Sequence, residues 1–103
     1  MVLDVDLGHF VECNDNAVRF FKMTRDELLA VGPDRISPPE QADGTSSFGV
    51  ARGHLDRALE GEAPCFEWTH RDAQGHDIPC EVRLVRLPSS GRQLIRGSIT
   101  DIT

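Results

Sequence analysis

Residues 65–87 read CFEWTHRDAQGHDIPCEVRLVRL, and this stretch decides the fold. Its two ends, 65–71 and 77–87, are rich in aromatic and β-branched residues, which favour β-strands. The Asp72–Gly75 segment between them carries turn-forming residues. After a Pro-Ser-Ser-Gly turn, the run 93–102 adds one more strand. The end of the chain is therefore predicted to be an antiparallel meander.

Two properties of the first hairpin point to different registers. If Arg71 pairs with Asp77, one strand face collects the apolar side chains, and burying them together favours that register. The same register would set Glu67 opposite Glu81, where like charges repel. The sequence alone does not decide which of these two effects is larger. In the Arg71–Asp77 register, the shared face holds Phe66, Trp68, His70, Ile78, Cys80, Val82 and Leu84.

The segment before the hairpin has the periodicity of a helix. Apolar residues recur with helical spacing over Phe48–Glu60, which predicts an amphipathic helix. Ser46 or Ser47 can cap its beginning, and Gly61 is a suitable stop. The predicted buried stripe consists of Phe48, Ala51, Leu55, Ala58 and Leu59.

The first part of the chain predicts a hairpin and two short helices. The runs Val2–Asp6 and His9–Cys13 meet at a Leu-Gly turn. Asn14–Asn16 can cap a helix that buries one apolar face, and Thr24–Glu27 has the spacing of a capping box. The helix that follows this box should end near Gly32-Pro33.

Two prolines interrupt the region between these helices and the longer one. Residues 33–47 are rich in Pro, Gly, Ser and Asp, so we expect an ordered loop with one helical turn. The order of elements is two strands, helices, then three strands. This order predicts an α+β fold with one antiparallel sheet and the helices packed on one face.

Composition narrows the class of protein. The 103 residues correspond to one domain, and no apolar run approaches a membrane span. A net charge of −6 tells against binding to a phosphate backbone. The odd set Cys13, Cys65 and Cys80 does not form a disulfide framework, which indicates reduced thiols and a cytoplasmic protein.

Short motifs occur in a characteristic order along the whole chain. They are Leu3–Gly8 with Asn14, Asn16-Ala17 with Phe21, Thr24 with Glu27–Leu29, Ser37–Gly44, Phe66–Arg71 with Gly75 and Pro79–Val82, and Gly97–Thr103. Together they resemble the PAS domain family. The Ser37–Gly44 loop resembles a variant seen in PAS modules of bacterial sensor kinases. The family often has glycine where this chain has Lys22, which we interpret as surface variation.

The resemblance implies a five-stranded antiparallel sheet in the order 2-1-5-4-3, with helices and the central loop over one face. It also implies a pocket between helix and sheet, and a sensory role without catalysis. In the family, the Asp-Ile-Thr ending precedes a linker to an effector. Residues 1–103 would then be a single PAS domain from a longer signalling protein. The alternative function is a dimerisation or interaction module that holds no ligand.

The candidate pocket joins the long helix to the sheet. For a small apolar ligand we predict contacts from Val50, His54, Leu55, Trp68 and Cys80. The competing interpretation is that Trp68 and its neighbours are plain core. Asp101 is predicted either to pass a signal to the following segment or simply to cap the strand end.

No cofactor is predicted. Haem-binding PAS domains take their histidine from the long helix, but a turn earlier, near Val50–Arg52, so His54 is interpreted as a boundary histidine. The cysteine motif of flavin-binding PAS domains is absent, and no close cysteine pair suggests a metal. No catalytic motif is present, although a Cys–His dyad stays open because spatial neighbours are not visible in a sequence.

A homodimer through the open sheet face is predicted for the full-length protein. Helices on one face leave the other face to solvent. Either Val85 and Leu87 or Leu94 and Ile102 must point outward, whichever register holds. Apolar side chains of this kind usually mark an interface.

Overall fold

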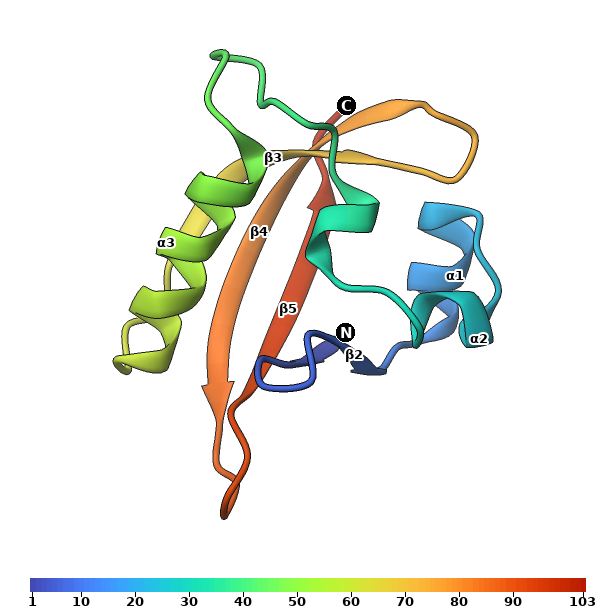
Figure 1. The fold of residues 1–103 in the computed structure, drawn as a ribbon. Coiled ribbons are helices and arrows are strands. Elements are labelled where there is room, and N and C mark those ends of the chain that lie inside the picture. Colours follow the sequence, from blue (N-terminus) through green and yellow to red (C-terminus); the bar gives the residue numbers. More distant parts are fainter.

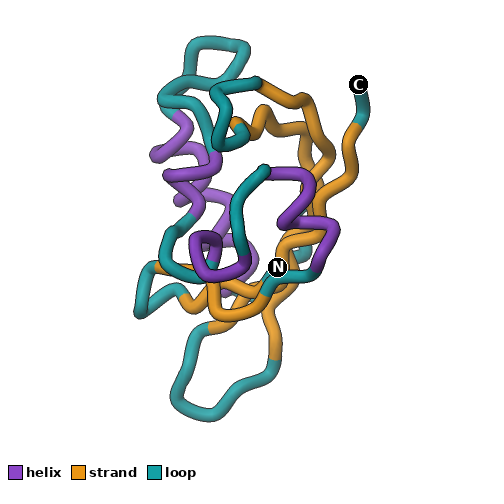
Figure 2. Tube along the Cα trace, turned by 90° about the vertical axis from the view of Figure 1, so that its right-hand side faces the viewer, coloured by secondary structure: helices purple, strands orange, loops and turns teal.

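The computed structural model describes residues 1–103 as one sheet with its helices on one face (Figure 1). The strand order is β2-β1-β5-β4-β3, and every pair is antiparallel, which confirms the predicted fold. Figure 2 shows the strands on one side and the long helix on the other. The elements are β1 (Val2–Asp4), β2 (His9–Glu12), α1 (Asp15–Phe21), α2 (Arg25–Leu28), the 3-10 helix η1 (Pro33–Ile36), α3 (Ser47–Leu59), β3 (Cys65–Arg71), β4 (Asp77–Leu87) and β5 (Leu94–Asp101).

The register of the β3–β4 hairpin follows burial rather than charge. Arg71 pairs with Asp77, and Glu67 lies directly opposite Glu81. Both glutamates are exposed, so water screens their repulsion. Trp68 is buried on the opposite face of the strand, toward the helices. The free energy of burying the apolar face therefore outweighs the glutamate pair.

The long helix turns most of the predicted stripe inward, but not its first residue. Ala58 is fully buried as expected, but Phe48 is 73% exposed, so its place in the buried stripe was wrong. The reason is local to the first turn, where Ser47 is buried instead. The Ser47 backbone N–H donates to Pro39 O at 3.0 Å. Its hydroxyl accepts from Gln41 Nε2 at 2.8 Å, and these bonds turn Phe48 outward.

The predicted caps of the first helices are present. Asn14 accepts a hydrogen bond from Ala17 N, and Thr24 with Glu27 forms the capping box. The second helix stops at Leu28, earlier than predicted, and a turn continues to Val31. The carbonyl of Val31 accepts the Phe10 N–H at 3.0 Å, which ties this turn to β2. The single helical turn expected in the loop is η1.

Lys22 has a structural role that the sequence did not indicate. It ends α1 with φ +55, the only non-glycine residue in the left-handed region. A glycine adopts this conformation without strain, which explains the family preference. Lys22 Nζ lies 3.4 Å from the buried carboxylate of Asp72. Surface variation is therefore an incomplete description, because Lys22 joins α1 to the β3–β4 turn.

The proline-rich loop is anchored to the edge of the sheet by Gln41. Its Oε1 accepts the Thr69 N–H at 2.8 Å, and its Nε2 donates to Thr69 O at 3.2 Å. The amide thus takes the place of a neighbouring strand beside β3. This anchor holds the loop and the start of α3 against the sheet.

Candidate functional site

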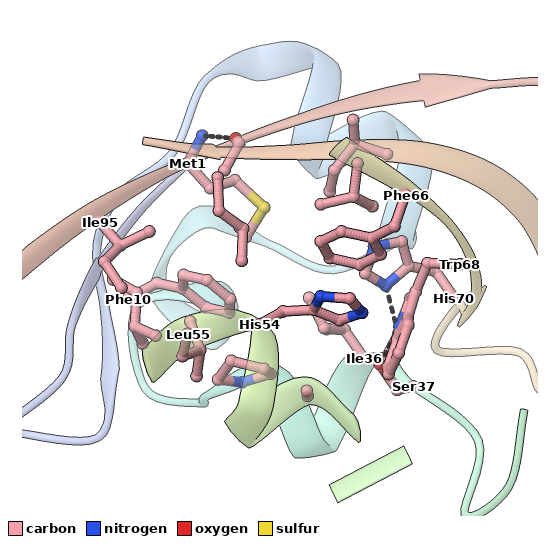
Figure 3. A pocket seen from close by; sticks show the side chains of 17 residues that line it. Met1, Phe10, Ile36, Ser37, His54, Leu55, Phe66, Trp68, His70 and Ile95 are labelled. Carbon is pink, nitrogen blue, oxygen red and sulfur yellow. Dashed lines mark hydrogen bonds between the residues drawn. The ribbon is translucent and has the colours of Figure 1, made fainter. Parts of the chain in front are cut away.

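A cavity of about 70 Å³ lies between α3, η1 and the inner face of the sheet (Figure 3). Of its 17 lining residues, 12 are hydrophobic. We call it the inner cavity. Its lining residues are Met1, Leu3, Phe10, Pro33, Ile36, Ser37, Ala51, His54, Leu55, Phe66, Trp68, His70, Val82, Leu84, Ile95, Gly97 and Ile99.

Strand alternation explains which sheet residues reach the inner cavity. Side chains two apart on a strand share a face. Phe66, Trp68 and His70 therefore line the cavity together from β3. On β5 the middle lining position is Gly97, whose missing side chain leaves space between strand and helix. A Cβ there would lie 3.6 Å from Leu84 Cδ2, an ordinary contact.

Three aromatic rings form one wall of the inner cavity. The rings of His54 and Phe66 are stacked, with centroids 3.6 Å apart and an interplanar angle of 3° (Figure 3). Trp68 meets His54 edge-on at 6.3 Å. Its indole N–H donates to Ser37 Oγ at 3.0 Å, which fixes the ring against η1. This wall joins α3, β3 and η1.

His70 is a buried, neutral histidine beside this wall. Its Nδ1 lies 3.0 Å from Ile36 O, and a carbonyl only accepts, so Nδ1 carries the proton. Burial lowers the pKa of His70 to about 4, and the bond to Ile36 only partly opposes this. The ring is therefore neutral at pH 7, and Nε2 is an acceptor. No hydrogen-bond partner satisfies this nitrogen.

His54 also has a lowered pKa, first because of burial and second because of the positive charge of Arg57. Its Nδ1 is buried without a hydrogen-bond partner. The inner cavity is thus apolar, with neutral imidazoles rather than charges in its wall. Such an environment favours uncharged, mostly apolar molecules.

The structure brings together only some of the predicted pocket residues. His54, Leu55 and Trp68 line the inner cavity. Val50 and Cys80 do not; they line a groove on the other side of the His54–Trp68 wall. Strand alternation could have identified His70, which shares its face with Trp68. The contribution of η1, through Ile36 and Ser37, has no sequence signal of its own.

The buried thiol of Cys80 is poorly suited to catalysis. Its Sγ donates to Ile78 O at 3.2 Å, and burial raises the pKa of Cys80 to about 11. A thiol of this kind is a weak nucleophile at neutral pH. No three of the chain's His, Cys, Asp or Glu side chains are arranged to hold a metal ion.

Asp101 lies at the end of β5. Its Oδ1 accepts from the backbone N–H of Thr103 at 2.9 Å and from the Thr103 hydroxyl at 2.6 Å. These bonds lower the pKa of Asp101. The side chain therefore caps the strand end, and its role in signal transfer stays a prediction.

The sheet order and the helices on one face define an α+β domain with a cavity between its two layers. A family model described as PAS domain matches residues 1–103, and the chain belongs to the PAS domain family. A search of curated proteins gave no match. No helix of the chain has both the length and the apolar character to cross a membrane.

Three solved structures illustrate the similarity. A PAS domain from a two-component sensor histidine kinase is 18% identical, with a TM-score of 0.75, over 97% of this chain and 80% of that one. The PAS domain of an HTR-like protein from Haloarcula marismortui is 22% identical, with a TM-score of 0.76, over 98% and 78%. A domain of a sensory box sensor histidine kinase/response regulator from Geobacter sulfurreducens is 27% identical, with a TM-score of 0.73, over 97% and 78%.

Proposed function

We propose that this PAS domain is a sensory module whose inner cavity binds a small, mostly apolar ligand. The observation that carries the proposal is the cavity itself, where 12 of 17 lining residues are hydrophobic. The similarity to a sensor histidine kinase domain supports a signalling context. We propose no catalytic step for the domain; the Cys80 thiol, whose pKa is raised by burial to about 11, is a weak nucleophile at neutral pH.

The size of the inner cavity limits the ligand. An apolar cavity of about 150 Å³ in another protein binds benzene. A cavity of about 70 Å³ therefore suits a short aliphatic group or another apolar group of similar size. The aromatic wall of His54, Phe66 and Trp68 would pack against it.

The final strand offers a route from the ligand to a following segment. Ile95, Gly97 and Ile99 of β5 line the inner cavity, and the same strand ends at Asp101. A ligand that shifts β5 would therefore shift the Asp101 cap. We propose that this cap couples the cavity to an effector beyond the domain.

Trp68 is the only tryptophan of the chain and lines the cavity, so its fluorescence reports on binding. We expect members of a panel of small apolar compounds to shift its emission and raise the melting temperature. Ala51→Phe, which places a ring in the cavity, should abolish both effects. The exposed substitution Arg19→Gln is the control. If no compound changes either signal, the sensory proposal fails.

A second candidate function is a dimerising interaction module. Val85 is a large hydrophobic residue that is 38% exposed, and strand alternation places it on the face of β4 opposite the buried Cys80 and Val82. Ile102, 44% exposed, follows β5 and lines the groove with Val50 and Cys80 instead. The outer face of the sheet would meet a second copy of the chain. Sedimentation at several concentrations should show weak self-association that Val85→Glu removes. A wild-type domain that stays monomeric throughout would contradict this function.

A further inference from the structure

A second space adjoins the inner cavity and opens between α3, η1 and the β1–β2 turn. Its volume is about 170 Å³. We call it the outer hollow. In Figure 1, α3 and η1 stand over the same sheet face, with the β1–β2 turn near them. It is lined by Leu3, Val5, Gly8, Pro33, Asp34, Ser37, Ser47, Phe48, Ala51, Arg52 and Leu55.

The two spaces share a wall. Leu3, Pro33, Ser37, Ala51 and Leu55 line both of them. A molecule in the outer hollow is therefore separated from the inner cavity only by these side chains. Because η1 is a single turn between loops, small movements of its residues would join the two spaces.

The chemistry of the outer hollow differs from that of the inner cavity. The outer hollow has two charged lining residues, Asp34 and Arg52. It also has Phe48, an aromatic ring that is 73% exposed without a protein partner to cover it. An apolar chamber with charged residues at its entrance matches an amphiphilic ligand better than a plain hydrocarbon.

The charges at the mouth indicate the sign of the polar group. Arg52 already forms an ion pair with Asp56, with Nε 3.3 Å from Oδ1. Asp34 forms no ion pair. Of the two charged residues that line the outer hollow, Asp34 is therefore the one without an ion-pair partner. The net charge of −6 attracts cations at long range as well.

We propose that the ligand is a small lipophilic amine. This inference rests on the proposed sensory function and names its ligand class. The hydrocarbon body lies in the inner cavity, and the ammonium group remains at the mouth beside Asp34. The exposed ring of Phe48 lines the same hollow, where a cation–π contact would add to the attraction. Arg52 is positively charged and is paired with Asp56, so Asp34 is the acidic side chain of the hollow that an ammonium group would approach.

The test compares four probes with the same branched hydrocarbon body: 3-methylbutylamine, 3-methylbutanol, 3-methylbutanoate and leucine. Calorimetric titration of the whole domain at neutral pH should show tightest binding for the amine. Asp34→Asn should weaken amine binding about fivefold, the upper range for an exposed ion pair, and leave alcohol binding unchanged. Asp26→Asn, an exposed carboxylate on α2, is the matched control.

The outcomes separate the amine inference from the sensory function. If the alcohol, the carboxylate or leucine binds as tightly as the amine, the cavity binds ligands but the amine inference is wrong. The same conclusion follows if Asp34→Asn and Asp26→Asn behave alike. If none of the four probes binds, while other apolar compounds shift Trp68 emission, only the inference fails. If no compound of either kind binds, both proposals fail.

Discussion

Two buried ionisable side chains lie close together near the end of β3, yet the protein holds them in opposite ways. Asp72, in the β3–β4 turn, accepts from the backbone N–H groups of Gln74 and His76 at 2.9 and 3.0 Å. Its other oxygen lies 3.4 Å from Lys22 Nζ. His70, beside the inner cavity, has one bond to Ile36 and one unpaired nitrogen.

The difference separates two regions. Around Asp72 a buried charge is compensated by hydrogen bonds and a lysine, whereas around His70 a buried acceptor nitrogen has no partner. Asp72 is kept charged, since its hydrogen bonds lower its pKa to about 2. His70 is kept neutral, since burial lowers its pKa to about 4. Buried polar atoms without partners cost free energy, so a protein normally keeps few of them. The atoms without a hydrogen bond here are Nδ1 of His54, Nε2 of His70 and Oδ2 of Asp72. Lys22 offsets the charge of the Asp72 oxygen, whereas the two nitrogens belong to residues that line the cavity.

The largest expected effect is the pH dependence that His70 imposes. Its pKa falls from 6.5 in the unfolded chain to about 4 in the folded domain. The unfolded state therefore binds more protons between these values, and stability falls as the pH falls from 6.5 to about 4. The loss should be about 3 kcal/mol, at about 1.4 kcal/mol per pKa unit. Urea unfolding across this range measures it.

His70→Asn provides the matched control, since its side-chain amide can still donate to Ile36 O but does not titrate. This variant should lose less stability than wild type between pH 6.5 and 4, with a remaining loss from His54, whose pKa is also lowered. If wild type and variant show the same slope, His70 is not the group responsible, and its contrast with Asp72 disappears.

Asp72→Asn should have the next largest effect. Here the charged form of the side chain stabilises the fold, whereas for His70 it is the neutral form. The lowered pKa of Asp72 means that its charged form stabilises the fold above about pH 3.8, and that this stabilisation is lost as the pH falls to about 2. We expect the variant to be less stable than wild type at pH 7, and the gap to close near pH 2. A gap that is constant with pH would show that the charge of Asp72 does not matter.

Gln41→Ala tests the side-chain amide that is hydrogen-bonded to the edge of β3. The substitution removes the hydrogen bonds to both backbone groups of Thr69 and should cost about 1–2 kcal/mol. The Thr69 amide hydrogen should then exchange faster with solvent, which NMR can follow. Gln74→Ala, at an exposed turn position, is the control. Unchanged exchange at Thr69 would show that the loop anchor contributes little.

Lys22→Gly should have the smallest effect, because two contributions oppose each other. Glycine relieves the strain of the left-handed backbone, worth about 1 kcal/mol. It also removes the ion pair to Asp72, which is partly exposed on the lysine side. We expect stability to change by less than about 0.5 kcal/mol. Lys22→Ala keeps the strain and loses the ion pair, so it should be less stable than Lys22→Gly; the reverse order would contradict this account.

Much of the local structure could be predicted from the sequence. The bounds of β3 and β4, the caps at Asn14 and Thr24, and the end of α3 at Gly61 agree with the prediction. Each depends on hydrogen bonds and periodicity within a few residues, and neighbouring residues in the chain carry that information. The antiparallel sheet followed from the order of these elements.

The tertiary structure alone decided how the candidate site is composed. The orientation of Phe48 depends on Gln41 and Pro39, which hold the start of α3. The pairing of Glu67 with Glu81 depends on what the opposite face buries against α3 and η1. Contacts between residues far apart in the sequence leave no periodic pattern within either segment. For this reason the sequence identified His54 and Trp68 as pocket residues, while the shared wall with the outer hollow emerged only once α3 and η1 were packed together.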